Sequence, residues 1–216
     1  MKILILSLMA VLLPFVVSAQ DISLPAPAAS VGVDLSTAIQ NRSVARAFVK
    51  KDLLAKDLST ILAAAIGKRA PDAIASATKA ARTVSFSGDN AYINLYVLDA
   101  KGTYAYDADR NVLKLLTAGD SRTAVTSEAI ANAAFIVVYT VNEALTPSFL
   151  KSNPAMFQTM AHSTAGASAQ NLTLTASALK LSSVVMYNLK PAAFVTAAKL
   201  PKDEIPLFLV QVGSAN

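Results

Sequence analysis

The chain has 216 residues, of which 54% are hydrophobic and 15% charged; this balance favours one domain with a well-buried core and excludes intrinsic disorder. Its formal net charge of +5 comes from Lys and Arg residues that never form a run longer than two, which argues against a nucleic-acid partner. The chain has no Cys and a single His, His162, which excludes thiolate nucleophiles, Cys/His zinc sites and other histidine-rich metal centres.

The first 19 residues have the pattern of a secretory signal peptide. Lys2 precedes an apolar stretch from Ile3 to Val17, and small residues allow cleavage near Ala19. The stretch is shorter than the roughly 20 residues that a spanning helix needs, and Pro14 interrupts it. We therefore expect a periplasmic or secreted protein that has no membrane attachment after signal cleavage. The alternative, a protein retained in the cytoplasm, requires that this segment is not a signal.

The remaining chain divides into a leader, residues 20–33, and one domain, residues 34–216. Pro25 and Pro27 lie among small residues and predict an extended leader that does not pack on the domain.

Two helices are expected at the start of the domain. Ser36 can cap the first, which runs to about Asn41. The second lies within residues 51–66, where apolar side chains recur on one face, and Gly67 is its expected left-handed stop.

A meander of strands and a long loop follow. Residues 68–90 show no clear period and predict a loop. The patterns YINLYVL and TYAYD, with a turn ending at Gly102, predict two paired strands, and VLKLLTA predicts a third. A helix is expected near residues 121–131, and FIVVYTV predicts a strand buried on both faces.

A long uncharged helix is expected next, with Asn153 as its cap and Pro154 at its first position. Between Lys151 and Lys180 no residue other than His162 can carry a charge, so we expect this helix, and this histidine, to be buried. Its many polar side chains make a membrane span costly. A second subunit is the natural cover for a helix that one small chain cannot enclose.

The remaining segments complete an α+β fold. SSVVMY and IPLFLVQVG predict buried strands, and Pro191 opens a helix that runs to about Lys199. Helices and strands alternate around an inserted meander, which predicts one mixed sheet flanked by helices.

Two polar clusters are candidates for binding. Arg42 and Arg46, four residues apart with Ser43 between them, could clamp a phosphomonoester, although a solvated cationic face is the alternative. The loop ARTVSFSGDN leads into a core strand, and rigidly positioned loops often carry binding groups; an ordinary surface loop is its alternative. No G-x-S-x-G elbow, G-x-G-x-x-G loop or Walker pattern is present.

The motifs, read in order, resemble the flavin-dependent nitroreductase family, particularly its branch of azoline oxidases. LSTAIQNRSVARAF is similar to the family's L-x-x-A-I-x-x-R-x-x-x-R-x-F opening, and RTVSFSGDN to its R-T-A-P-S-x-x-N loop. YVLDAKGTYAYDADRNVLKLLTAGDSR, AGASAQNLTLTASALKLSSV and PLFLVQVG resemble later segments, so the resemblance covers residues 34–213. It implies the nitroreductase fold, with a mainly antiparallel sheet and the uncharged helix at a dimer interface.

The resemblance also implies a homodimer with FMN at the subunit interface, acting on a small-molecule substrate. FMN would carry the chemistry, so no catalytic side chain and no metal are expected. The electron donor is either NAD(P)H or, for an exported protein, another donor. The residues implied to bind FMN are Arg42, Ser43 and Arg46 at its phosphate, Arg82, Thr83, Ser85 and Asn90 near its ring, and Tyr187 and Asn188 at its N5 edge.

Four positions depart from the family's pattern. Val44 replaces a serine, Ser85 replaces the loop proline, and Lys180 and Asn188 stand where glycine is common. Asn tolerates the left-handed backbone better than most residues, which suits position 188. The alternative function is therefore a non-catalytic, degenerate protein of the same fold that binds a ligand or acts structurally.

Overall fold

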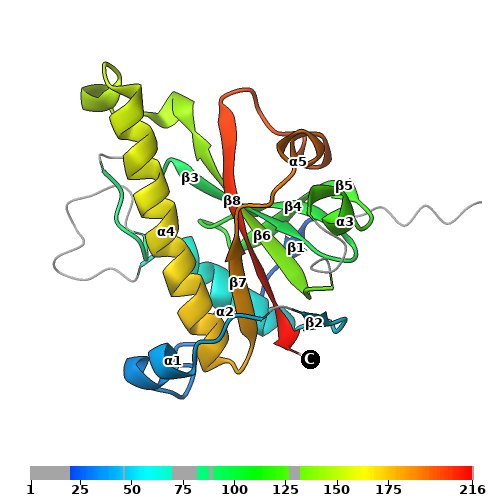
Figure 1. Ribbon diagram of the computed structural model, residues 1–216. Coiled ribbons are helices and arrows are strands. Elements are labelled where there is room, and N and C mark those ends of the chain that lie inside the picture. The colour runs from blue at the N-terminus through cyan, green and yellow to red at the C-terminus, as the bar shows by residue number, and fades with distance from the viewer. Residues whose placement is uncertain (1–19, 46, 70–81, 88–89, 127–131, 216) are drawn as a thin grey trace, which may run out of the picture.

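The computed structural model describes residues 20–45, 47–69, 82–87, 90–126 and 132–215. At its centre is a sheet whose strands are ordered β1-β5-β4-β3-β6-β8-β2, with β7 also paired to β8 (Figure 1). The strands are β1 (Ile22–Ser23), β2 (Phe48–Val49), β3 (Ile93–Leu98), β4 (Gly102–Asp107), β5 (Val112–Ala118), β6 (Phe135–Asn142), β7 (Ser182–Met186) and β8 (Glu204–Ala215).

The predicted meander and central strand are confirmed. β3 pairs antiparallel with β4, and β4 with β5. In the first turn, Asp99 Oδ1 accepts hydrogen bonds from the backbone N–H groups of Lys101 at 2.7 Å and Gly102 at 2.9 Å. β6 lies between β3 and β8 and is buried at every position except Asn142, as its unbroken apolar run predicts.

Helices cover both faces of this sheet. They are α1 (Leu35–Asn41), α2 (Ala55–Ile66), α3 (Arg122–Val125), α4 (Pro154–Ala178) and α5 (Pro191–Ala198), and two 3₁₀ turns, η3 (Glu143–Leu145) and η4 (Ser148–Leu150), connect β6 to α4. α2 and α4 pack on one face, and α3 and α5 on the other (Figure 1). The predicted α+β class and long helix are confirmed, including the cap of α4, where Asn153 Oδ1 accepts from the Met156 N–H at 3.1 Å.

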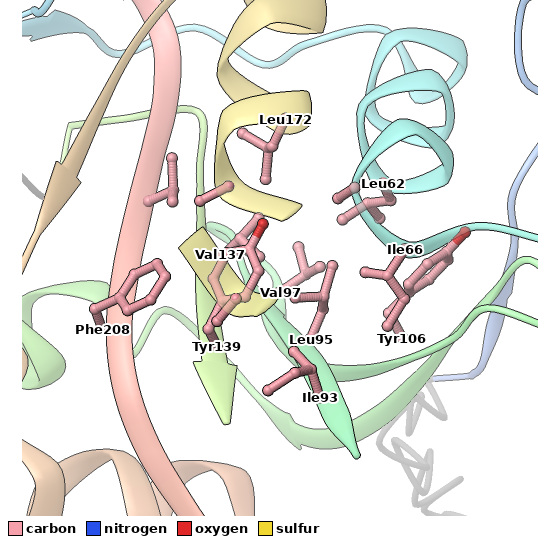
Figure 2. Close-up of a cluster of buried hydrophobic side chains, with 14 of the residues drawn as sticks. Leu62, Ile66, Ile93, Leu95, Val97, Tyr106, Val137, Tyr139, Leu172 and Phe208 are labelled. Atoms are coloured by element: carbon pink, nitrogen blue, oxygen red, sulfur yellow. The ribbon is translucent and has the colours of Figure 1, made fainter. Parts of the chain in front are cut away.

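The larger core lies between the sheet and the pair α2 and α4. Leu62 and Leu172 project from the two helices onto Val97 and Tyr139 of the sheet (Figure 2). Alanines on the buried side of α4 allow α2 to approach closely, and the Ser168 hydroxyl donates to the Ala65 carbonyl at 2.8 Å. The two helices therefore form one rigid layer.

The leader, residues 20–33, is extended but packs on the domain, so the expectation that it does not pack was wrong. Ile22 pairs opposite Leu113 of β5, and the Ala28 N–H donates to Thr60 Oγ1 at 2.9 Å. Proline removes an N–H donor but keeps its carbonyl as an acceptor. The Pro25 carbonyl uses this capacity and accepts from the Ser59 hydroxyl at 2.6 Å.

Two helix ends also differ from the sequence prediction. The cap of α1 is Asp34 rather than Ser36, because the Asp34 carboxylate accepts from both the N–H (2.9 Å) and the hydroxyl (2.7 Å) of Thr37. These bonds lower the pKa of Asp34. Gly67 ends α2 at a φ of −61°, outside the left-handed region, and a Cβ there would collide with the Ala63 backbone.

Two further elements are less regular than predicted. α3 ends at Val125, and residues 127–131 of the helix predicted there lie outside the described residues. β7 is only partly buried, because one edge pairs with β8 and the other makes a single bridge, between Val44 and Ser183. It is therefore a sheet-edge strand rather than a buried one.

A buried carboxylate ties three strands together. Glu204 Oε2 accepts hydrogen bonds from the Tyr96 hydroxyl at 2.7 Å and the Thr140 hydroxyl at 2.9 Å, and Oε1 accepts from Asn94 Nδ2 at 2.7 Å. Burial, followed by the Glu204 hydrogen bond, raises the pKa of Tyr96, so its hydroxyl remains a donor. These bonds join β3, β6 and β8 at the end where β8 begins.

We predict that Glu204→Gln destabilises the fold by about 1–3 kcal/mol. An amide offers one acceptor oxygen, so at least one of the three donors would face an NH₂ group. Urea unfolding measures the loss, and a Tyr96→Phe double-mutant cycle should show coupling. Glu143→Gln, at an exposed glutamate, is the matched control and should change stability by less than about 0.5 kcal/mol. Equal effects of the two Gln variants would contradict this role.

A buried arginine and its ion pair fix the start of α3. Arg122 is buried and donates from Nε to Asp120 Oδ1 at 2.8 Å and from Nη2 to Oδ2 at 2.6 Å. Its Nη1 donates to the carbonyls of Ala133 and Ala134, just before β6. The Arg122 hydrogen bond lowers the pKa of Asp120.

We predict a pH-dependent contribution of Asp120 to stability. Because its pKa is lowered in the folded state, the stabilisation is present above the unfolded value of about 3.9 and is lost as the pH falls through the folded pKa. The free-energy difference between wild type and Asp120→Asn, from urea unfolding, should thus be largest near neutral pH and shrink below about pH 4. Asp203→Asn, at an exposed carboxylate, should show no such trend.

Candidate functional site

Arg42 and Ser43 lie on the surface directly after α1. Both residues are exposed, and the Arg42 N–H closes the helix by donating to the Ile39 carbonyl at 3.3 Å. Within the described part of the chain, the Arg42 side chain has no hydrogen bond or ion pair. It is thus a cation available to a ligand. Arg46, the other half of the predicted clamp, lies outside the described residues.

β7 extends from this cation toward a second exposed group. Val44 bridges Ser183 at the start of β7, so Arg42 lies beside the beginning of that strand. Tyr187 and Asn188 follow its other end and are exposed. At the rise of a strand, the four steps from residue 183 to residue 187 span about 13 Å. The structure therefore places the predicted phosphate and N5-edge residues at the two ends of one strand.

The outer part of β7 on the α4 side is apolar. Val185 pairs opposite Val210, whose side chain belongs to the α2 and α4 core, so Val185 shares that face, yet it is 41% exposed. The Tyr187 ring lies 5.6 Å from Phe208 of the same core and is 75% exposed. Sequence reasoning missed Val185, and its apolar exposure becomes visible only once β7 is known to be an edge strand.

The loop that carries Arg82 lies elsewhere. Arg82 Nη2 pairs with Asp109 Oδ2 at 3.0 Å, next to the turn between β4 and β5. Strands β3, β6 and β8 separate this turn from β7. The described residues of one chain therefore do not bring Arg82 together with Arg42.

The rest of the loop contacts α2 and α4. The Thr83 hydroxyl donates to the Ala63 carbonyl at 3.1 Å, and the Thr83 carbonyl accepts from Asn171 Nδ2 at 3.2 Å. Ser85 and Asn90 are exposed. Asn171 belongs to the motif AGASAQNLTLTASALKLSSV, and no role was predicted for it from the sequence. In the structure its side chain holds this loop on α4.

The two clusters lie on the two flanks of the exposed face of α4. Asn171 contacts the Thr83 loop, whereas Ser177 donates to the Ala38 carbonyl of α1 at 2.9 Å. Six residues separate them, which places the two side chains roughly 120° apart around the helix. Between them α4 exposes an uncharged surface that includes Gly166, Ala167 and Gln170.

Within one chain His162 is not buried, so its predicted burial depends on the expected second subunit. His162 is exposed on α4, and its Nδ1 lies 2.8 Å from the Gln158 carbonyl. One chain covers only one side of the helix, so this position lies at the open surface. Among the described helices none is long and apolar enough to cross a bilayer.

The backbone conformation explains why glycine is common in the family at position 180, but not why it is common at position 188. Lys180 has a φ of +59° at the end of α4, where the Leu181 N–H donates to the Ala176 carbonyl at 2.9 Å. This is the position of a glycine cap, and a lysine there is strained. Asn188, by contrast, is not among the described residues with a positive φ, so the tolerance of Asn for a left-handed backbone is not used there.

Arg42, Ser43, Val185 and Tyr187 form an exposed strip along β7, called the β7 strip. The β7 strip fits an elongated anionic ligand with a planar ring. Arg42 and the Ser43 hydroxyl offer charge-assisted contacts at one end, and Val185 and Tyr187 offer apolar and aromatic surface at the other. A hollow of about 420 Å³ between the leader, α2 and Thr83 includes none of these four residues. The strip is thus an open surface, and a ligand bound there would need a further cover.

Comparisons with known proteins agree with this fold. A protein from Ralstonia eutropha JMP134 assigned as a nitroreductase matches with a TM-score of 0.79 and 26% identity, over 93% of this chain and 91% of its own. One from Anabaena variabilis ATCC 29413 matches at 0.70 and 18%, over 91% and 42%. The NADPH:FMN oxidoreductase of Vibrio harveyi, in complex with NAD⁺, matches at 0.56 and 16%, over 84% and 66%.

The sequence comparisons are narrower. No curated protein matches the chain. The Nitroreductase family profile matches residues 39–214, which spans most of the domain. The chain therefore belongs to the nitroreductase family.

Proposed function

We propose that the protein is an FMN-dependent oxidoreductase that transfers hydride or electrons to or from a small organic substrate. The observation that carries this proposal is that Arg42, which has no side-chain partner among the described residues, and the exposed Tyr187 lie at the two ends of β7, in a chain of the nitroreductase family. When bound, FMN would supply the redox chemistry. The neighbouring V. harveyi enzyme, named as an NADPH:FMN oxidoreductase, supports flavin as the cofactor and a nicotinamide as one candidate donor.

Each residue has a defined part in this proposal. Arg42, with Ser43 and Arg46, would hold the phosphate of FMN through charge-assisted hydrogen bonds. Arg42 lies beside the start of β7, and a ligand held there would extend along the strand toward Tyr187 and Asn188. Arg42 is exposed and forms no ion pair among the described residues, so no carboxylate of the described chain competes with a phosphate for it.

A homodimer would complete the site. α4 exposes a surface without formal charge between Lys151 and Lys180, which suits burial against a second copy. Its two flanks carry the Thr83 loop and the α1 and β7 strip. If two copies pair through α4 in opposite directions, the Thr83 loop of one chain approaches the β7 strip of the other. Arg82, Thr83, Ser85 and Asn90 would then contact the flavin held by the partner.

Export is a separate part of the proposal. Residues 1–19 lie outside the described residues, and the proposal of a periplasmic or secreted protein depends on their composition alone. An exported enzyme would meet little NAD(P)H, so its donor would be another reduced compound. Mass spectrometry of the mature amino terminus tests this part independently of flavin binding.

We predict that Arg42→Ala weakens FMN binding more than about tenfold, because a charge-assisted contact to a phosphate contributes about 1.5–3 kcal/mol. Titration of the flavin-free protein measures the dissociation constant. Arg110→Ala, at an exposed arginine in the turn between β4 and β5, is the matched control and should bind FMN as wild type does. A wild-type protein that binds no FMN would leave the degenerate, non-catalytic alternative.

We also predict that Ala167→Arg dissociates the dimer. The substitution places a charge at the middle of the uncharged face of α4, where a partner would have to bury it. Sedimentation velocity should show monomers at concentrations where wild type is dimeric. Ala192→Arg, at an exposed alanine of α5 on the other face of the sheet, should remain dimeric. Dimers of the Ala167→Arg variant would exclude this face as the interface.

A further inference from the structure

Three aromatic rings contact one another in a row from the core to the surface beside β7. Tyr139 of β6 stacks on Phe208 of β8 with ring centroids 4.9 Å apart and an interplanar angle of 22° (Figure 2). Phe208 contacts Tyr187 in turn, with centroids 5.6 Å apart at 51°. Tyr139 and Phe208 are buried, whereas Tyr187 is 75% exposed.

The inner rings are fixed by the core. The Tyr139 hydroxyl lies 3.3 Å from the Ser168 hydroxyl of α4, and Ser168 also donates to the Ala65 carbonyl of α2. Phe208 is buried in the same cluster. The base of the stack is therefore rigid, and Tyr187 presents most of its ring to solvent from a fixed support. Such a pre-organised aromatic loses little conformational freedom when it binds a partner.

Tyr187 is also distinct among the oxidisable aromatic residues of the chain. The chain has no Trp and six Tyr, all of which the structure describes. The other five, Tyr92, Tyr96, Tyr104, Tyr106 and Tyr139, are buried. A ligand on the surface of this protein can therefore stack on one tyrosine ring, that of Tyr187.

We infer that the Tyr187 side chain is a positioning residue whose ring stacks against the isoalloxazine ring of FMN. This inference rests on the proposed function and goes beyond it, because that function used only the position of Tyr187 at the end of β7. The position of Arg42 at the other end of the strand indicates which ligand stacks on Tyr187. A ligand anchored there by a phosphate and extended along about 13 Å of β7 reaches Tyr187 with its far end. In FMN, that end is a planar, electron-poor ring, which the electron-rich phenol ring favours.

Flavin fluorescence separates stacking from a purely structural role. A tyrosine in contact with the excited flavin ring quenches its emission by lending it an electron, which then returns to the phenol. Phenylalanine stacks equally well but is too hard to oxidise to do so. Since the chain has no Trp, quenching of bound FMN reports on Tyr187 in either subunit of a dimer.

The test titrates FMN into the flavin-free protein and compares wild type with Tyr187→Phe and Tyr187→Ser. We expect quenched emission from FMN bound to wild type. Tyr187→Phe should raise the bound emission severalfold while the dissociation constant stays within about threefold. Tyr187→Ser should weaken binding about tenfold, because it removes the stacked ring. Phe149→Ser, at an exposed phenylalanine of η4, is the control and should match wild type in both measurements.

The outcomes distinguish this inference from the proposed function. Bound emission that is equally quenched in wild type and Tyr187→Phe overturns the stacking, even if FMN binds tightly. A Tyr187→Ser variant that binds FMN as wild type does also overturns it. If wild type binds no FMN, both the function and this inference fail. If Tyr187→Ser does not fold, as circular dichroism would show, the comparison with Tyr187→Phe still decides.

Discussion

The pairing of β8 is the constraint on which the rest of the structure depends. β8 pairs with β6 along one edge and with β7 along the other, and near its carboxyl end it also pairs with β2. The contact with β2 joins segments that lie more than a hundred residues apart in the sequence. Gly213 permits a close approach of β2, since a Cβ there would meet the Phe48 ring and the Ala134 backbone at 3.0 Å. The candidate site exists because this strand holds residues 42–49 and 182–188 together.

The fold was largely predictable because its patterns are local. The unbroken apolar run of β6, the alternation in the meander and the Asn153-Pro154 cap each determine an element through nearby residues alone. Predictions failed where a distant partner decides the outcome. The carbonyl of Pro25 packs because Ser59, in α2, donates to it. Similarly, β7 has the composition of a buried strand but lies at the sheet edge, which only the order of strands determines.

The site was predictable only in part, and from motifs rather than from physical patterns. The resemblance named both ends of the β7 strip, and the structure places them on one strand. It could not show that Arg82 pairs with Asp109 or that α4 separates the Thr83 loop from Arg42, because both depend on tertiary contacts. The same geometry explains why the exposed, uncharged face of α4 is important for the candidate site. Residues of a single binding site that lie on opposite flanks of α4 can meet only when two chains supply one flank each.

The distribution of charge indicates where an anion can bind. Arg122 is buried and neutralised by Asp120, and Arg82 is paired with Asp109. The buried carboxylate of Glu204 is satisfied by three neutral donors, so it requires no cation. Arg42 differs from these groups because it is exposed and has no such partner among the described residues. An anion that reached Arg82 or Arg122 would have to displace a carboxylate, whereas at Arg42 it would displace only water. Because an ion pair already formed within the fold opposes a new one, electrostatics favours the end of α1 over Arg82 and Arg122, independently of any family resemblance.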